Sequence, residues 1–267
     1  MKKVYAVLNL IVLLAVVYWN YYSITGGING HTVSDLSDEY ANLFTPAGYA
    51  FAIWGVIYLA LIALVGAQVK WAFFGGDDAG SILQIGPWLM IANLGNALWI
   101  WLWLTERTGA SVAVMGVILL SLIMIIRCTN MERWDAAFPV IALVWWPICL
   151  YSGWIAVAAI ANVAAWLAKL EWSVLFNEVQ WTVIMISVAG VLNLLMIRYR
   201  NMREFASVGV WALVAIAVRH WGELPLVQWT SLLWAIILLI AIGLHAYKNR
   251  EFLPFLNRRH KRSSSNA

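Results

Sequence analysis

The chain has 267 residues and a formal net charge of +4, and 63% of its residues are hydrophobic while only 11% are charged. With a mean hydropathy of +0.80 it has too little polar surface to cover a globule in water, so the composition excludes a soluble globular protein. In a bilayer only helices or a closed barrel satisfy every backbone group, and the long apolar runs lack the alternation of barrel strands. The sequence therefore predicts an all-α, polytopic membrane helix bundle.

About eight transmembrane helices are predicted from the apolar segments. The first follows Lys2 and Lys3 and is longer than the apolar core of a signal peptide, so we expect it to be retained. A polar loop, residues 23–44, separates it from the second helix, and loops this long are usually functional or disordered. The predicted helices are residues 4–22, 45–68, 82–104, 110–126, 136–168, 174–197, 206–221 and 226–247.

The fifth segment, residues 136–168, would be about 50 Å long as one helix, which is enough to raise the question of two crossings. A single crossing places both chain termini on one side with 14 of the 17 Lys and Arg residues, whereas two crossings leave only 7 there. Cytoplasmic loops carry the excess of basic residues, so one crossing with a kink at Pro147 is predicted. Both termini are then cytoplasmic, in a multi-pass protein of the cell (inner) membrane.

The second predicted helix opens with a proline and a cluster of aromatic residues. Pro46 suits a first helical turn, where a missing N–H costs nothing. Phe51, Trp54 and Tyr58 recur at i, i+3 and i+7 and share one face. Together with Tyr49, this pattern resembles the second helix of the TspO/MBR family, the translocator proteins or tryptophan-rich sensory proteins.

Two further motifs of that family appear in the expected order. Asn96 and Trp99, near the end of the third predicted helix, resemble its Asn-x-x-Trp, which a short turn follows. In the fifth predicted helix, Trp154, Ala158 and Asn162 keep the spacing of its Trp-x-x-x-Ala-x-x-x-Asn. The chain thus resembles a long form of the family with a C-terminal extension.

The resemblance covers roughly residues 1–170, which are predicted as a TspO-like domain of five helices. Residues 171–250 are predicted as a membrane extension of three helices, and residues 251–267 as a basic cytoplasmic tail. The family's proline lies one turn later than Pro147, which leaves Tyr151 as an alternative equivalent of the family's tryptophan.

In this topology the polar and aromatic residues of the first five helices converge on the outer side, beneath the first loop. An aromatic pocket with a few amides suits a flat, largely apolar ligand, although the same residue types are also typical of ordinary interhelical packing. Arg107 is the outer cation expected to meet an anionic group on the ligand. The predicted ligand-binding residues are Tyr49, Phe51, Trp54, Tyr58, Asn96, Trp99, Trp103, Arg107, Pro147, Tyr151, Trp154, Ala158 and Asn162.

The resemblance implies binding of a tetrapyrrole such as porphyrin or haem, or of a sterol-like molecule, as a ligand of a sensory or regulatory protein. It also implies a homodimer as a partner besides the lipid bilayer, and no nucleic acid. No nucleophile, base, or cluster of His and Cys indicates catalysis or a metal site. A small-molecule transporter or facilitator is the alternative, although no Asp, Glu, Lys or Arg lies mid-helix to couple ions.

Overall fold

The computed structural model describes residues 1–25, 28–40, 42–76, 79–134, 136–171 and 176–249, and the predicted basic tail lies outside them. The long helices of this part of the chain are α1 (Lys2–Ile24), α3 (Ile53–Phe74), α5 (Trp88–Leu104), α6 (Thr108–Cys128), α8 (Trp146–Lys169), α9 (Glu178–Arg200), α10 (Arg203–Arg219) and α11 (Pro225–Lys248). The shorter helical elements are α2 (Val33–Glu39), η1 (Gly48–Ala52), α4 (Gly80–Ile85), α7 (Phe138–Val140) and η2 (Ile141–Trp145).

Each predicted segment contains one long helix, so the all-α prediction is confirmed. Six of the described helical segments are long and apolar enough to cross a membrane. Helices α5 and α10 are shorter, at 17 residues each, and pack against neighbours that belong to those six. The chain is therefore a multi-pass membrane bundle.

The third predicted helix is wrong in one respect, because the structure divides it into α4 and α5. Gly86 takes a left-handed conformation with a φ of +51°, and Pro87 is the N-cap of α5. Proline lacks an N–H and disfavours the α conformation in the residue before it, so the helix stops and restarts here.

The fifth predicted segment is a single helical segment long and apolar enough to cross a membrane, as the predicted single crossing requires. It is helical without interruption from Phe138 to Lys169. Its irregularity is the π-helical turn η2, which ends one residue before α8 and two before Pro147. A wider turn at this point accommodates a proline ring and its missing N–H, which accounts for the expected kink.

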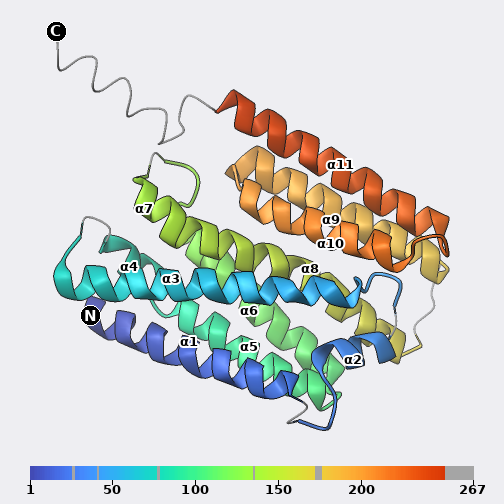
Figure 1. Ribbon diagram of the computed structural model, residues 1–267, viewed down its shortest axis with the longest axis horizontal. Coiled ribbons are helices and arrows are strands. Elements are labelled where there is room, and N and C mark those ends of the chain that lie inside the picture. Colours follow the sequence, from blue (N-terminus) through green and yellow to red (C-terminus); the bar gives the residue numbers. More distant parts are fainter. Residues whose placement is uncertain (26–27, 41, 77–78, 135, 172–175, 250–267) are drawn as a thin grey trace.

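Helix α8 lies at the centre of the bundle, and α10 packs on it from the side opposite α3 and α6 (Figure 1). Helices α1 and α5 complete the first group, while α9 and α11 pack on α10. Within one 18-residue apolar window of each segment, 72% of the residues are buried in the Phe138–Lys169 segment, against 22% in α1 and 28% in α11. The apolar faces of α1 and α11 therefore point outward, as lipid contact requires. The division into five-helix and three-helix domains stays a prediction.

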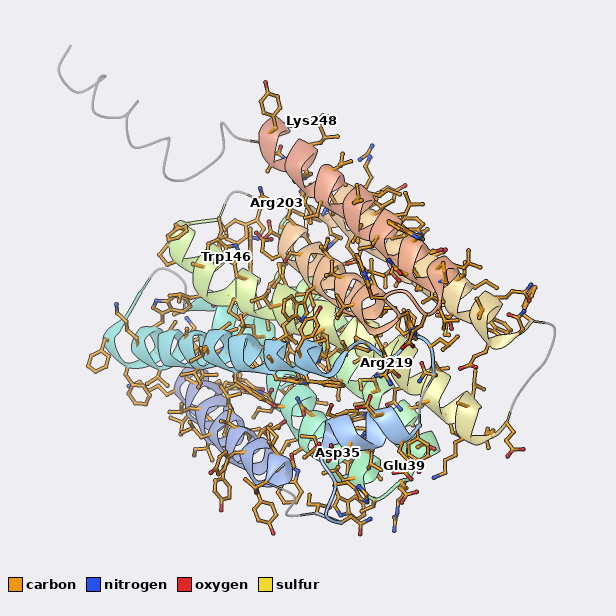
Figure 2. All side chains as sticks on the ribbon, turned by 45° about the vertical axis from the view of Figure 1, so that its right-hand side comes forward. Asp35, Glu39, Trp146, Arg203, Arg219 and Lys248 are labelled. Atoms are coloured by element: carbon orange, nitrogen blue, oxygen red, sulfur yellow. The ribbon has the colours of Figure 1, made fainter. Side chains whose placement is uncertain are left out.

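The two ends of the bundle differ in charge. Figure 2 shows Asp35, Glu39 and Arg219 at one end, here called the α2 end, and Arg203 and Lys248 at the other, here called the terminal end. The α2 end carries the basic residues Arg107, Lys169 and Arg219. The described basic residues of the terminal end are Lys2, Lys3, Lys70, Arg127, Arg133, Arg198, Arg200, Arg203 and Lys248.

Candidate ligand-binding site

An aromatic cavity lies at the α2 end. Helices α3, α5, α6 and α8 enclose it, and α2 contributes Ser37 to its lining. The described residues that line it carry no charge. Eight of the residues predicted from the sequence are among them: Phe51, Trp54, Asn96, Trp99, Trp103, Trp154, Ala158 and Asn162.

The cavity is narrow. The cavity and its open mouth together hold about 690 Å³ free of protein atoms, but the centre of a water molecule can occupy only about 50 Å³. Sites for small organic ligands usually offer about 300–1,000 Å³. A flat molecule can therefore enter only if the elements that cover the cavity move.

Aromatic rings form two of its walls. Trp99 and Trp103 stack with ring centroids 5.8 Å apart, and Phe51 meets Trp154 edge to face at 6.0 Å. The rings come from α5, η1 and α8, so three elements must pack correctly to form the walls. Flat aromatic faces of this kind suit a planar or fused-ring ligand.

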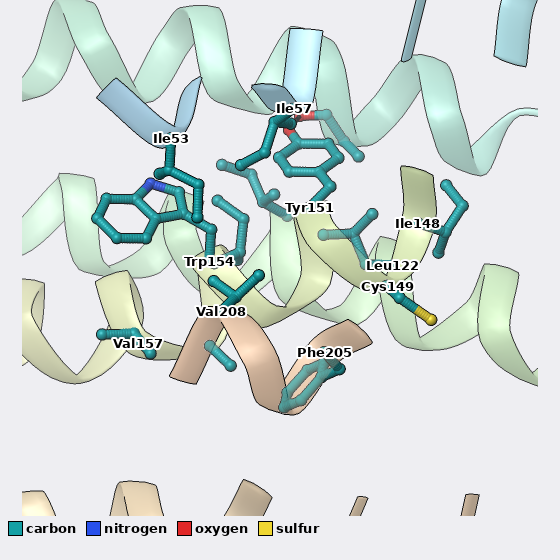
Figure 3. Packing of buried hydrophobic residues seen from close by; sticks show 14 of the residues in the cluster. Ile53, Ile57, Leu122, Ile148, Cys149, Tyr151, Trp154, Val157, Phe205 and Val208 are labelled. Carbon is teal, nitrogen blue, oxygen red and sulfur yellow. Dashed lines mark hydrogen bonds between the residues drawn. The ribbon is translucent and has the colours of Figure 1, made fainter. Parts of the chain in front are cut away.

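The deep end of the cavity holds buried polar groups. Trp54 stacks on Tyr58 and meets the edge of Tyr151, which is fully buried and donates to the carbonyl of Ala92. Figure 3 shows Tyr151 directed toward Ile57 of α3, which places it behind the cavity wall. The side-chain oxygen of Asn96 is buried and accepts no hydrogen bond from the described residues, while the Asn96 amide lies close enough to the hydroxyls of Tyr58 and Tyr151 to interact with both. Asn96 also lines the cavity, so its amide is the polar group best placed to meet a ligand.

The side chain of Asn162, by contrast, forms hydrogen bonds to other residues of the protein with both of its polar atoms. Its side-chain oxygen accepts a hydrogen bond from Trp99 Nε1 at 2.7 Å, and its nitrogen donates to Ser111 at 2.9 Å. The Ser111 hydroxyl in turn donates to the carbonyl of Thr108. These bonds fix the indole of Trp99 in the wall, so Asn162 acts on the cavity through Trp99.

Five predicted residues lie outside the lining. Besides Tyr58 and Tyr151, Tyr49 packs edge to face on Trp211 of α10, and Pro147 is buried at the start of α8. The Arg107 guanidinium lies 5.0 Å from the ring of Trp101 and outside the cavity lining, so its expected contact with an anionic group on a ligand stays a prediction. The turn after α5 directs it outward along the helix surface.

Apart from Pro46, which belongs to the second-helix motif but precedes η1 instead of lying in a first helical turn, the other lining residues carry no motif and were not predicted from the sequence. Met115 and Ile118 of α6 are ordinary aliphatic residues at helical spacing, which signals burial but not which cavity they face. Ser37 belongs to a segment interpreted as loop. The remaining lining residues outside the prediction are Thr45, Pro46, Ile155, Val157, Ala161 and Ala165.

Helix α2 acts as a lid over the cavity. Thr32 and Asp35 form a capping box at its start. Leu36 is fully buried beneath it, and Trp103 donates its indole N–H to the carbonyl of Val33. With seven residues the lid is too short to be stable alone, so it depends on these contacts.

One set of polar contacts fastens the lid to the turn between α5 and α6. The Tyr40 hydroxyl donates to the carboxylate of Glu106, and Lys169 donates to both the Tyr40 hydroxyl and the Glu106 carbonyl. Lys169 and Glu106 also form an ion pair at 3.6 Å. These three residues, here called the lid strap, are partly exposed to solvent, which screens their charges and makes their hold on the lid weak.

Helix α10 fastens both the lid and the cavity mouth. Arg219 pairs with Asp38 of the lid at 2.6 Å and donates to the carbonyl of Pro46. His220 contacts the carbonyl of Leu43 at 2.8 Å, and Trp211 donates to the carbonyl of Ala50. Helix α10 and the residue after it thus position the chain that enters α3.

We expect the lid to loosen only in acid. The hydrogen bond from Tyr40 and the charge of Lys169 hold the pKa of Glu106 below its ordinary value of 4.5. Burial and the hydrogen bond to Glu106 raise the pKa of Tyr40 above 10.0. The strap is therefore intact above pH 4.5 and is lost as the pH falls through the lowered pKa of Glu106. A spin label at Glu39→Cys in a Cys128→Ala background should keep constant mobility from pH 5 to pH 9 and gain mobility only as the pH falls below 4.5.

Protonation of Asp35 in acid should also loosen the lid, because hydrogen bonds from the backbone and side chain of Thr32 lower the pKa of Asp35. Glu106→Gln separates the two effects: it should raise lid mobility already at pH 7 and leave a smaller acid step. A step between pH 5 and pH 8, or a Glu106→Gln variant that behaves like the parent, would contradict this account of the lid strap.

The family profile described as TSPO-like protein matches residues 6–244, which run from α1 into α11. No curated protein and no solved structure matches the chain.

Proposed function

We propose, because this chain belongs to the TSPO-like family, that it binds a flat, largely apolar small molecule in the aromatic cavity and acts as a sensory or regulatory membrane protein. The ligand is of the porphyrin or sterol type. The observation that carries the proposal is the cavity itself: aromatic walls from three elements, no charge in the described lining, and the unpaired amide oxygen of Asn96 at its deep end.

The absence of charge in the described lining favours uncharged ligands. A carboxylate placed inside would lose its water shell without gaining a cation, which is costly in an apolar site. A sterol hydroxyl would meet Asn96 without that cost. A tetrapyrrole with two propionates would have to leave them at the mouth, near Lys169 and Arg219.

Binding, not catalysis, is the proposed activity. The side chains that line the cavity are apolar, aromatic, amide or hydroxyl groups, and none is paired with a general base. The lid must open for entry and can close over a bound ligand, which gives the protein two states that a partner could distinguish. We place both termini in the cytoplasm, because the described basic residues gather at the terminal end.

A titration with a matched pair of porphyrins tests the proposal. Protoporphyrin IX and its dimethyl ester have the same ring, but only the free acid carries carboxylates. In detergent we expect saturable tryptophan quenching by both in the micromolar range, with the ester binding about ten-fold more tightly, equivalent to about 1.4 kcal/mol. A fluorescent sterol should compete with either one.

Variants locate the site. Trp54→Leu and Trp154→Leu should each weaken binding of the ester at least ten-fold, because each removes an aromatic wall. Trp229→Leu is the control, because Trp229 is an exposed residue of α11 that does not line the cavity. Binding that is unsaturable, or equally weakened by all three changes, would refute a site in this cavity.

A further inference from the structure

Three potential metal ligands meet at the terminal end of the bundle. Glu132 follows α6, Cys149 lies in the first turn of α8, and Glu204 lies in the first turn of α10. One ligand atom from each lies within 4.8 Å of the other two. We call these residues the acid–thiol cluster. They come from three separate segments, which is why the sequence analysis predicted no metal site.

The cluster is closed on the protein side. Cys149 has no exposed surface, and Figure 3 shows its side chain directed away from Tyr151 and the aromatic cavity. Its sulfur lies 3.9 Å from the thioether of Met131, which is also fully buried. Glu132 and Glu204 are only partly buried, so an ion could enter between the two carboxylates from the terminal end.

The carboxylates lack the partners that buried acids need. One oxygen of Glu204 is buried and accepts no hydrogen bond from any described residue. Arg203 is near enough to act on Glu132 electrostatically, yet no ion pair is formed with either acid in the described part of the chain. Arg203 acts on Glu132 and Arg200 on Cys149 only at a distance, so the two acids and the buried thiol have no directly bonded cation among the described residues.

We propose that Glu132, Cys149 and Glu204 bind one divalent transition-metal ion of the Zn²⁺ class. Ligand atoms around a tetrahedral zinc lie about 3.3–3.8 Å apart, so small side-chain rotations would suffice to close the cluster on an ion. A thiolate with two carboxylates suits zinc or cobalt better than the hard ions calcium and magnesium. The fourth position falls to water.

A proton is the competing occupant. Burial and the neighbouring Glu204 raise the pKa of Glu132 to about 8, so without a metal this carboxyl keeps its proton at neutral pH. A metal ion and a proton would occupy the same carboxylates, and the variants below distinguish the two. The site would also fasten α10 to α8 and to the turn after α6.

Cobalt binding to the full-length protein tests the site. After chelator treatment, the protein in detergent should take up one Co²⁺ per chain, with thiolate-to-cobalt charge-transfer absorption and the intense visible bands of a tetrahedral ion. Zn²⁺ should abolish these bands, whereas excess Mg²⁺ or Ca²⁺ should not. Zn²⁺ at a hundred-fold excess over its dissociation constant should raise the melting temperature by about 5 °C.

Two variants and one control decide the assignment. Cys149→Ser should abolish the charge-transfer band, and Glu204→Gln should weaken Co²⁺ binding at least ten-fold while both remain monodisperse. Cys128→Ser removes the other cysteine, which is exposed, and should change nothing. Absence of the band in the parent protein, its survival in Cys149→Ser or its loss in Cys128→Ser would overturn the proposal. A parent that binds no metal but melts at a higher temperature as Glu132→Gln would establish the proton instead.

Discussion

Replacing Asn96 by leucine is expected to weaken ligand binding about ten-fold while leaving the protein at least as stable as before. The side-chain oxygen of Asn96 is buried without a partner, and such a group destabilises a fold by about 1–3 kcal/mol. Leucine has a similar size and removes that cost. The free energy of unfolding, measured by titration with a denaturing detergent, should therefore hold or rise by about 1 kcal/mol.

Asn162→Leu is the matched comparison, because it makes the same chemical change in the same cavity. Loss of the Asn162 amide leaves Trp99 Nε1 without a hydrogen-bond acceptor, so the indole of Trp99 is no longer held in the cavity wall. Stability should fall by about 1–3 kcal/mol, and binding should fall with it. If Asn96→Leu destabilises the protein as much as Asn162→Leu, Asn96 serves packing, and its role toward a ligand is refuted.

Replacing Gly153 by alanine is expected to separate α8 from α10 and to disturb the cavity mouth. An added Cβ would lie 2.8 Å from the carbonyl oxygen of Phe205 and 3.1 Å from Cβ of Val208. Figure 3 shows Phe205 and Val208 of α10 next to α8 at this crossing. A backbone oxygen cannot rotate away, so the helices must shift, at a cost of about 1–3 kcal/mol.

Gly116→Ala in α6 is the control, because an added Cβ there meets nothing within 4 Å. Alanine is the better helix former by about 1 kcal/mol, so this variant should be neutral or slightly stabilised. The Gly153 variant should also bind the porphyrin ester more weakly, since α10 holds Pro46 and Ala50. A Gly153→Ala protein with unchanged stability would contradict the close α8–α10 contact.

The eight helical segments could be predicted because membrane helices need long apolar runs, and the single crossing near Pro147 because basic residues mark one side. Two boundaries had local signals that the predicted elements did not include. Gly86 and Pro87 form a helix break, and Thr32 with Asp35 forms a helix start inside the segment interpreted as a loop.

The cavity was predictable only where the wall residues are chemically distinctive. Trp54 and Trp154 carry motifs, whereas Met115 is one of many aliphatic residues and gives no sign of its neighbours. The distinction between the two asparagines depends on whether each amide finds a partner in the folded protein. The hold of α10 on the mouth runs mostly through main-chain carbonyls, which leave no pattern in a sequence.

Photo-crosslinking tests the central claim most directly, namely that the ligand sits in the aromatic cavity under the lid. A diazirine-bearing sterol, bound near its dissociation constant and irradiated in detergent, can be mapped by mass spectrometry. We predict that the labelled residues fall within 45–58, 96–118 and 154–165, and that excess unlabelled sterol or porphyrin ester removes the label. Labelling confined to the outward faces of α1 and α11, or label that no competitor removes, would contradict the claim.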